Sequence, residues 1–318
     1  MNRKIIIGID TSNYTTSLAL LYDDGELIAN LKSPLPVKSG ECGLRQSDAV
    51  FAHTKKIPEL MLKARVILGR NTPSAIGVSV KPRNLDGSYM PCFLSGRAAA
   101  YSVACSLGIK LYEFSHQCGH IMAALYSSGA YGLLDSRFAA LHISGGTTEL
   151  LRVSSLESGF AAELVGGTDD LNAGQVIDRV GVFMGLPFPS GAHMERLALE
   201  FRGKIPKKRP SVRGLKFNLS GLENMAKKLY TETQDRSLVS SFVFDYVFES
   251  ISSICDNYEL EFGKMPFVFA GGVMSNSIIK TKIKERRDAY FAEPAMSADN
   301  AVGVAVLAMR RFNSEIDK

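Results

Sequence analysis

The sequence predicts an α/β protein built from two related halves, and three observations support this prediction. First, its 318 residues are enough for two compact domains of ~100–200 residues each. Second, segments with the hydrophobic period of a helix alternate with short β-branched runs, an order typical of sheets covered by helices. Third, a unit of strand, small polar turn and return strand occurs twice, which indicates a duplicated fold.

The two copies of this unit lie far apart in the chain. Written as strand, turn and return strand, they are residues 4–10, 10–12 and 17–22, and residues 138–143, 144–148 and 149–153. In each copy a buried-type apolar run ends in small polar residues, which is the pattern of a hairpin. Hairpins are common, so two unrelated hairpins would give the same pattern by coincidence.

The same periodicities predict the other elements in chain order. Helical spacing of apolar residues occurs in six segments, residues 49–68, 96–107, 116–126, 173–184, 237–261 and 300–312. Further strands are predicted near residues 27–28 and at residues 75–80, 266–270 and 289–291. Residues 201–216 carry two prolines and many charges without apolar periodicity, so we expect an excursion from the second half there.

Composition excludes several classes of protein. Hydrophobic residues make up 46% and charged residues 22%, which is the balance of a globular chain and not of a disordered or collagen-like one. No apolar run reaches the ~18 residues that a bilayer span needs, and the N-terminal apolar stretch is too short for a signal peptide. We therefore expect a cytoplasmic protein that does not cross a membrane.

Cysteine spacing and missing motifs exclude some kinds of site. The five cysteines are scattered and form no Cys-x-x-Cys pair, which argues against a disulfide framework and against a four-sulfur zinc site. The chain also has no Gly-x-Ser-x-Gly elbow and no Gly-x-x-x-x-Gly-Lys-Ser/Thr loop. Its net charge of +5 is compatible with a nucleic-acid partner but does not require one.

Three turns of small residues follow predicted strands, at residues 10–12, 144–148 and 270–273. Glycine lets the backbone come close to a phosphate, and the N–H groups of such a turn point at the anion. Three turns of this kind at strand ends favour a nucleotide-binding cleft. The alternative is that all three are ordinary tight connections.

A candidate metal site comes from two histidines in one predicted helix. His116 and His120 are four residues apart and therefore face the same side, with Ser115 as a plausible N-cap. Asp299 has the right chemistry for a third ligand, and two histidines with one carboxylate suit iron or zinc. The alternatives are that the histidines are surface or core residues and that Asp299 caps the following helix.

Two further groups of charged residues have both a functional and a structural interpretation. Asp169, Asp170 and Asp178 could hold Mg²⁺ or substrate hydroxyl groups, or they could be helix caps and surface residues. The basic stretch around residues 201–216 could neutralise RNA phosphates, or it could be a solvated surface. Its densest part is Lys207, Lys208 and Arg209.

Taken together, these motifs resemble the TsaD family, the tRNA N6-threonylcarbamoyladenosine synthase subunit once described as a glycoprotease. The matching segments, in chain order, are Gly8-Ile9-Asp10-Thr11-Ser12, His116-x-x-x-His120, Ser144-Gly145-Gly146-Thr147-Thr148-Glu149-Leu150, Asp169-Asp170 to Asp178, Phe188-Pro189-Ser190-Gly191, Gly214 to Leu222, Ala270 to Asn276, and Asp299-Asn300. In the family the first three read Gly-Ile-Glu-Thr-Ser, His-Met-Glu-Gly-His and Ser-Gly-Gly-His-Thr-Gln-Leu. The resemblance extends over most of the chain.

The resemblance implies a fold and an activity. The fold is a pair of related actin-like (ASKHA, ribonuclease-H-like) domains around a nucleotide cleft, which we place at residues 1–115 and 116–299. The C-terminal helix 300–318 would return to the first domain, and a basic excursion near 201–220 would belong to the second. The activity is transfer of the threonylcarbamoyl group of threonylcarbamoyl-AMP to N6 of adenine-37 in tRNA.

The resemblance also assigns roles to residues. His116, His120 and Asp299 would hold one divalent metal, iron or zinc, and Asp10 and Ser144 would be catalytic. ATP or threonylcarbamoyl-AMP, with Mg²⁺ as a further candidate cofactor, would contact His142, Ile143, Ser144, Gly145, Gly146, Asp178, Gly191 and Asn276. Lys207, Lys208 and Arg209 would contact tRNA, and the expected protein partners are TsaB-like and TsaE-like.

Several departures from the family pattern mark a divergent member. Residues 13–16 replace the family's Cys-Asp-Glu-Thr, and residues 81–87 replace a Gly-Pro-Gly-rich loop. Thr147 stands in place of a histidine, and Ser190 in place of a glycine. Two alternative functions therefore stay open: a carbamoyl transferase with a small-molecule acceptor, and a non-catalytic nucleotide-binding partner of a true synthase.

Overall fold

A computed structural model describes residues 3–12, 14–36, 44–156 and 159–316. Its first sheet has the strand order β3-β2-β1-β4-β5. These strands are β1 (Ile5–Ser12), β2 (Thr15–Tyr22), β3 (Leu27–Pro34), β4 (Ala75–Lys81) and β5 (Lys110–Ser115). Strands β1, β2 and β3 form an antiparallel meander, while β4 and β5 run parallel to β1.

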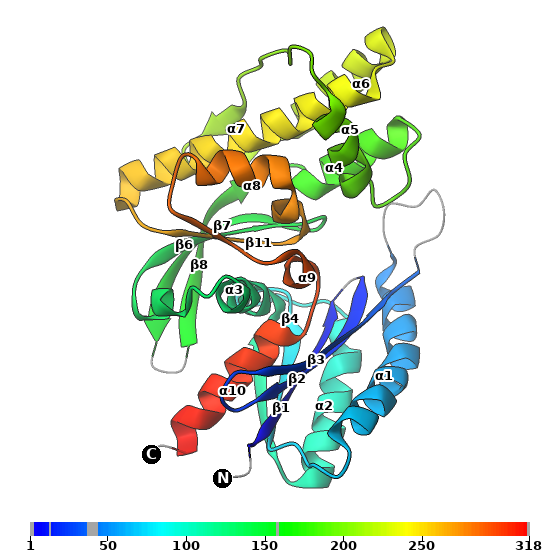
Figure 1. The fold of residues 1–318 in the computed structure, drawn as a ribbon, viewed down its shortest axis with the longest axis vertical. Helices are drawn as coiled ribbons and strands as arrows, with labels where there is room; N and C mark the ends of the chain where they lie inside the picture. Colours follow the sequence, from blue (N-terminus) through cyan, green and yellow to red (C-terminus); the bar gives the residue numbers. More distant parts are fainter. Residues whose placement is uncertain (1–2, 13, 37–43, 157–158, 317–318) are drawn as a thin grey trace.

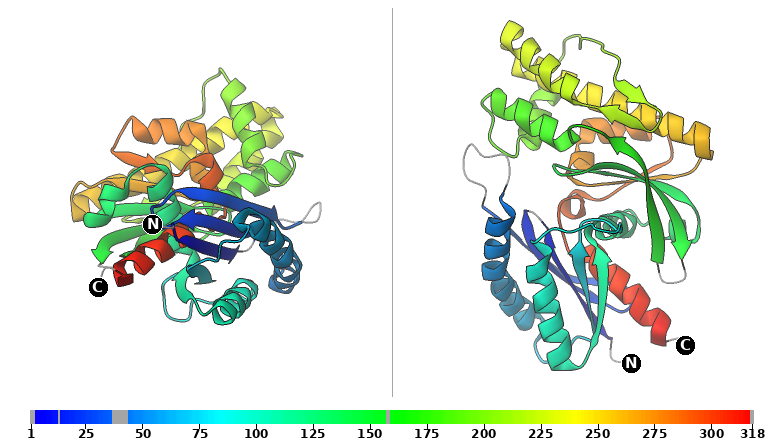
Figure 2. Two further views of the ribbon diagram at one scale, coloured as in Figure 1. Left: turned by 60° about the horizontal axis from the view of Figure 1, so that its bottom comes forward. Right: turned by 180° about the vertical axis from the view of Figure 1, so that it is seen from behind.

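Helices cover both faces of this sheet (Figures 1 and 2). Helices α1 (Gln46–Leu68) and α2 (Phe93–Leu107) lie on one face, and α10 (Val302–Ile316) lies on the other. The strand alternation explains this, because Ile5 and Ile7 of β1 pack toward α1 and α2 whereas Ile6 packs toward α10.

The second sheet has seven strands in the order β12-β11-β6-β7-β8-β10-β9. These strands are β6 (Phe138–Ile143), β7 (Thr148–Leu156), β8 (Gly159–Thr168), β9 (Ser211–Arg213), β10 (Lys216–Asn218), β11 (Phe267–Ala270) and β12 (Ala289–Phe291). The helices around this sheet are α3 (His116–Ser127), α4 (Ala173–Phe183), α5 (Gly191–Glu200), α6 (Ser220–Thr233), α7 (Arg236–Phe262), α8 (Ser277–Lys284) and α9 (Pro294–Ser297). Helix α3 lies between the two sheets and packs against α10 (Figure 1).

The two sheets share one topology, which supports the predicted duplication. The meander β6-β7-β8 corresponds to β1-β2-β3, and the parallel strands β11 and β12 correspond to β4 and β5. In both copies the first strand of the meander lies between the second strand of the meander and a parallel strand, and it ends at one of the predicted small-residue turns. The domain bounds proposed from the sequence stay a prediction.

Helix α7 is long and apolar enough to cross a membrane by length and composition alone. In the structure, however, 78% of its most apolar 18-residue segment is buried. Its buried side chains include Phe244, Phe248 and Tyr258, which pack in the core behind the second sheet. Helix α7 is therefore a core helix of this half of the molecule.

The sequence predictions missed some elements. Strands β5 and β8 were not predicted because neither alternates cleanly: β5 carries exposed Lys110 and Glu113, and the middle of β8 is exposed. The expected excursion at residues 201–216 is irregular only as far as residue 210, after which β9 and β10 pair with each other and extend the sheet beside β8. Helices α5 and α6 were also missed.

Candidate functional site

The three predicted metal ligands lie together. The Ser115 hydroxyl caps α3 by accepting a hydrogen bond of 3.2 Å from the Cys118 amide, so the helix begins at His116. The Nε2 atoms of His116 and His120 are 3.0 Å apart, and Oδ1 of Asp299 lies 3.6 and 3.4 Å from them. One ligand atom from each residue lies within 4.8 Å of the others, which is close enough to share one ion.

Asp10 supports this cluster from the end of β1. Its buried carboxylate lies 3.0 Å from Nδ1 of His116, so the other ring nitrogen is left facing Asp299. A carboxylate on the far nitrogen of a metal-binding histidine fixes the ring orientation. Burial lowers the pKa of His116, but the negative charges of Asp10 and Asp299 outweigh burial and raise this pKa to about 9. Asp10, predicted as catalytic, therefore contacts a candidate ligand directly.

Asp299 is not the cap of α10. The side chain of the next residue, Asn300, accepts a hydrogen bond of 3.0 Å from the Val302 amide instead. Burial raises the pKa of Asp299, but its hydrogen bond to His120 and the charges of both histidines hold it below its usual value. The Asp299 carboxylate is thus left for the histidine cluster.

His142 lies beside the same cluster, whereas the resemblance predicts a contact with the nucleotide. Its ring centroid lies 4.4 Å from that of His120, and its side chain is 3% exposed. Neither ring nitrogen has a hydrogen-bond partner in the part of the chain that the structure describes. Burial lowers the pKa of His142 well below its usual value, which leaves the ring neutral. In the sequence, His142 looks like one more core position of a buried strand.

The turn after β6 leaves part of its backbone accessible to a ligand. The Ser144 carbonyl accepts a hydrogen bond of 3.2 Å from the Gly174 amide, which places the turn against the N-terminus of α4. No described atom lies within 4 Å of a Cβ added to Gly145 or Gly146, so the backbone there is open. Ile143 differs because its side chain is fully buried in the strand and only its backbone can reach a ligand.

The remaining predicted nucleotide contacts have structural partners. Asp178 accepts a hydrogen bond of 2.7 Å from the Ser190 amide and so fixes the turn that precedes Gly191. Burial raises the pKa of Asp178, and the hydrogen bond from Ser190 opposes this shift. Asn276 caps α8 by accepting a hydrogen bond of 3.0 Å from the Ile279 amide. These side chains fix the turn before Gly191 and the start of α8.

Asp170 and Asp169 also have structural partners. Asp170 accepts hydrogen bonds from the Leu219 and Ser220 amides at 2.8 and 3.0 Å, at the start of α6. Asp169 forms an ion pair of 2.8 Å with Lys216. The structural interpretation of these two carboxylates is the one that the geometry favours over Mg²⁺ binding.

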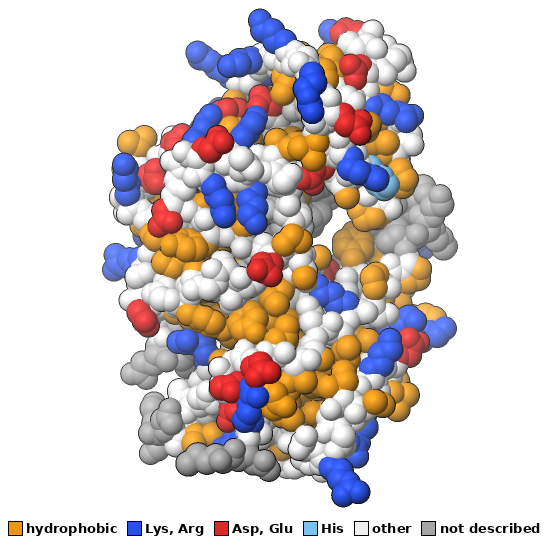
Figure 3. Space-filling view, viewed as in Figure 1, with side chains coloured by type: hydrophobic (Ala, Val, Ile, Leu, Met, Phe, Trp, Pro, Cys, Tyr) orange, Lys and Arg blue, Asp and Glu red, His pale blue; other side chains and the backbone are white. Residues whose placement is uncertain are grey.

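The basic stretch is exposed. Lys207, Lys208 and Arg209 are all exposed, and within the described residues no ion pair involves them. Basic side chains gather at the end of the molecule formed by this stretch and α6 (Figure 3). Among the described residues, these three side chains therefore have no acidic partner that neutralises their charge.

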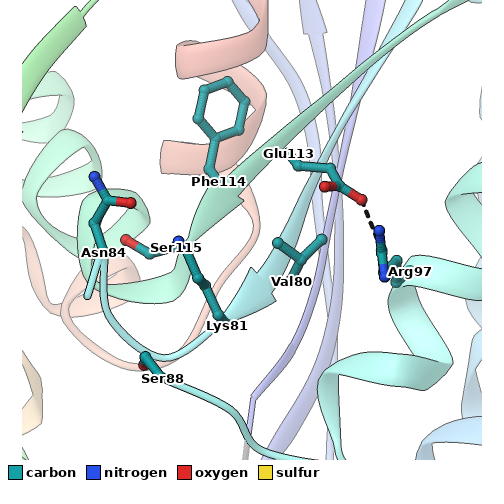
Figure 4. A pocket seen from close by; sticks show the side chains of 8 residues that line it. All are labelled: Val80, Lys81, Asn84, Ser88, Arg97, Glu113, Phe114 and Ser115. Carbon is teal, nitrogen blue, oxygen red and sulfur yellow. Dashed lines mark hydrogen bonds and ion pairs between the residues drawn. The ribbon is translucent and has the colours of Figure 1, made fainter. Parts of the chain in front are cut away.

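Two polar pockets lie near the ends of strands. One, of about 390 Å³, lies beside β4 and β5, and its Arg97 and Glu113 form an ion pair of 2.7 Å (Figure 4). The other, of about 360 Å³, lies between the segment after β4 and strands β7 and β8. Arg83 and Glu149 line this second pocket and form an ion pair that sequence analysis did not identify.

Comparison with protein families identifies relatives over most of the chain. The model of the TsaD family, described as tRNA N6-adenosine threonylcarbamoyltransferase, matches residues 46–306. A protein of that name from Streptococcus suis is 30% identical over 335 residues, which cover 99% of this chain and 94% of the relative. The proteins of that name from Methanopyrus kandleri and Thermus thermophilus are 26% and 29% identical and cover 95% and 96% of this chain.

Solved structures share the fold at low sequence identity. Full-length HypF in a phosphate- and nucleotide-bound form matches with a TM-score of 0.62 and 12% identity, over 98% of this chain and 46% of that one. The activator of 2-hydroxyisocaproyl-CoA dehydratase from Clostridium difficile matches with a TM-score of 0.54 and 11% identity, over 99% and 98%. These neighbours confirm the predicted fold class of two related actin-like domains. The family match, the relatives and the ordered motifs together establish that this chain belongs to the TsaD family.

Proposed function

We propose that this chain transfers the threonylcarbamoyl group of threonylcarbamoyl-AMP to N6 of adenine-37 in tRNA. Membership of the TsaD family supports this reaction. The observation that carries the proposal is the cluster of His116, His120 and Asp299, which meets where β1 and β6 end and beside the open turn at Gly145. A Lewis acid can polarise the carbonyl of an adenylate, and a phosphate-binding turn can hold its phosphate, so both features favour acyl transfer.

His116, His120 and Asp299 would hold the metal, iron or zinc, with Asp10 orienting His116 and His142 as a further donor. When bound, such a metal would supply Lewis-acid polarisation of a carbonyl or phosphate oxygen. The donor set fits because it offers imidazole nitrogens and one carboxylate. His142 fits because its two ring nitrogens have no partner among the described residues.

The open turn would hold the nucleotide, either ATP or threonylcarbamoyl-AMP. Glycine at positions 145 and 146 leaves room for phosphate oxygens beside the backbone. The Gly146 amide donates a hydrogen bond of 3.3 Å to the Ser144 hydroxyl, and it would exchange this bond for one to the phosphate. Ser144 lies at the same turn and can donate its hydroxyl to the adenylate. Any Mg²⁺ would come with the phosphates, because Asp170 caps α6 and Asp178 holds Ser190.

The proposal is tested by a transfer assay. Purified chain, supplied with TsaB-like and TsaE-like proteins and threonylcarbamoyl-AMP, is expected to modify tRNA transcripts that carry adenine-37 and not transcripts with guanine there. Mass spectrometry of the digested tRNA measures the product. Transfer to a small molecule but never to tRNA would favour the small-molecule transferase, and stimulation of another synthase without transfer by this chain would favour the non-catalytic partner.

Substitution of Lys207, Lys208 and Arg209 by alanine is expected to weaken tRNA binding without changing metal content. Each phosphate contact contributes about 0.7–0.9 to the slope of log affinity against log salt, so losing all three lowers the slope by about 2–3. Titration of labelled tRNA at several salt concentrations measures this slope. Substitution of Lys280 and Lys284 of α8, two cations elsewhere on the second half, is the control. An unchanged slope in the triple variant would remove this stretch from the RNA-binding surface.

The protein partners and the location in the cytoplasm are also parts of the proposal. Helix α1 supports a protein partner because Phe51, Leu62 and Val66 lie on one face of it and are 66%, 69% and 81% exposed. Exposed apolar side chains that share one face are typical of a protein–protein contact. A TsaB-like protein is the occupant that we propose for this face.

A further inference from the structure

We propose that Arg83, held in place by the buried carboxylate of Glu149, binds the anionic group of the substrate in the pocket beside the metal cluster. The group is an oxyanion, either the carboxylate of the threonyl part or the phosphate of the adenylate. This inference rests on the proposed function for its choice of substrate. It adds a specificity-determining residue, Arg83, and a positioning residue, Glu149.

Three segments meet at Glu149. Its side chain on β7 is 5% exposed, forms an ion pair with Arg83 and accepts a hydrogen bond from the buried Gln117 amide on α3. The Gln117 backbone amide also donates a hydrogen bond of 3.0 Å to the Pro82 carbonyl, and the Arg83 amide donates one of 3.0 Å to the Ser88 hydroxyl. The segment after β4 is thus fixed against α3 and β7 at the position of Arg83.

Arg83 keeps donors for a ligand. A guanidinium carries five N–H donors in a planar fork, and the contact with Glu149 uses Nε. No hydrogen bond from Nη1 or Nη2 to another described residue is present, and the side chain is 41% exposed toward a pocket of about 360 Å³. A fork with two free ends is the geometry that binds carboxylate or phosphate through two hydrogen bonds.

The pocket adjoins the metal cluster. Glu149 is directly opposite His142 in the antiparallel pairing of β6 and β7, so the two side chains lie on the same face of the sheet. Gln117, the other partner of Glu149, follows His116 on α3. An anion on the free end of Arg83 would therefore lie next to the ion that His116, His120 and Asp299 can share.

A purely structural role does not explain the pair well. Burying a carboxylate carries a desolvation penalty that its ion pair only partly offsets. An apolar contact would therefore fix the same segment with a smaller loss of stability. Burial accordingly raises the pKa of Glu149, even though Arg83 and Gln117 oppose the shift. Both members of the pair also replace family residues: Glu149 stands at the glutamine of Ser-Gly-Gly-His-Thr-Gln-Leu, and Arg83 lies in the segment that replaces the Gly-Pro-Gly-rich loop.

Two matched pairs of probes test the proposal by calorimetry on the metal-loaded protein. N-carbamoyl-L-threonine and its amide differ only in the carboxylate, and AMP and adenosine differ in the phosphate. Wild-type protein is expected to prefer the anion in at least one pair by tenfold or more, since a hydrogen bond to a charged group is worth about that much. The pair that shows the preference identifies which oxyanion Arg83 binds.

Arg83→Gln is expected to reduce that preference about tenfold, to near equality, while binding of the neutral member of the pair is unchanged. Arg83→Lys should keep part of the preference because it retains the charge without the fork. Glu149→Gln should lower the preference several-fold, since the guanidinium is no longer held. Arg152→Gln is the matched control. Arg152 lies on β7, the strand that carries Glu149, and pairs with Glu163. Its side chain is 41% exposed, like that of Arg83.

Three results would overturn the proposal. They are no preference for either anion in the wild-type protein, an unchanged preference in Arg83→Gln, and an equal loss of affinity for all four probes in that variant. The last result would assign Arg83 a structural role only. Failure of the transfer assay with an intact, Arg83-dependent preference would count against the proposed function alone. Failure of the preference in a chain that still modifies tRNA would count against the Arg83 proposal alone.

Discussion

The double substitution His116→Ala and His120→Ala is expected to leave the purified protein without bound metal and without transfer activity. The two imidazoles supply two of the three ligand atoms that lie within 4.8 Å of one another. Asp299 and the proposed donor His142 alone would leave fewer than the three protein ligands that iron and zinc sites use. Elemental analysis of dialysed protein measures metal per chain, and the tRNA assay measures transfer. His193→Ala is the matched control because His193 contacts Arg196 on α5 and lies outside the cluster.

Asp10→Asn extends this prediction to the residue behind His116. The amide keeps the shape of the side chain but loses the charge that orients the ring, 3.0 Å from Nδ1. Losing such a supporting partner lowers metal affinity or activity by about 10–100-fold. The metal content and transfer activity of Asp10→Asn should therefore lie between those of the control and those of the double variant. Full metal content in the double variant would show that other residues bind the ion.

Local sequence patterns predicted the parts of the site that one element contains. The spacing of His116 and His120 is a property of a single helix turn, and Ser115 could be recognised as its cap because capping depends on neighbours in sequence. The same reasoning predicted the strand Phe138–Ile143 and the small turn after it. The chemistry of Asp299 made it a candidate third ligand, and the resemblance to a family assigned it to the same metal as the two histidines.

Contacts between distant segments could not be predicted in the same way. His142 joins the cluster because β6 lies beside α3, and a buried strand position gives no local sign of this neighbour. Arg83 meets Glu149 because the segment after β4 reaches β7, 66 positions along the chain in sequence numbering. Strand β8 was missed because its stability depends on pairing with β7 rather than on its own alternation.

Gly303→Ala is expected to lower the stability of the protein strongly and to weaken metal retention. Helices α3 and α10 cross at this glycine, and a Cβ there would lie 1.8 Å from the carbonyl oxygen of Gly119. The contact is with backbone inside a helix, so no side chain can rotate away. Overpacking of this kind costs about 3 kcal/mol or more, which corresponds to a fall of about 6 °C or more in the thermal midpoint.

Gly221→Ala is the matched control for this prediction. Gly221 is also near the start of a helix, α6, but no described atom lies within 4 Å of an added Cβ. Alanine there should leave the midpoint unchanged or raise it, because alanine favours a helix over glycine by up to about 1 kcal/mol. Scanning calorimetry of both variants separates the steric effect at the crossing from the general effect of removing a glycine.

Metal retention links this crossing to the site. Gly119 lies between His116 and His120 on α3, and Gly303 follows Asp299 by four residues. Moving α10 away from α3 therefore moves the carboxylate away from both imidazoles, whose present distances to it are 3.6 and 3.4 Å. Gly303→Ala should lose metal at temperatures where the chain is still folded. If the variant kept both its midpoint and its metal, the crossing of α3 and α10 could not be what brings the carboxylate to the histidines.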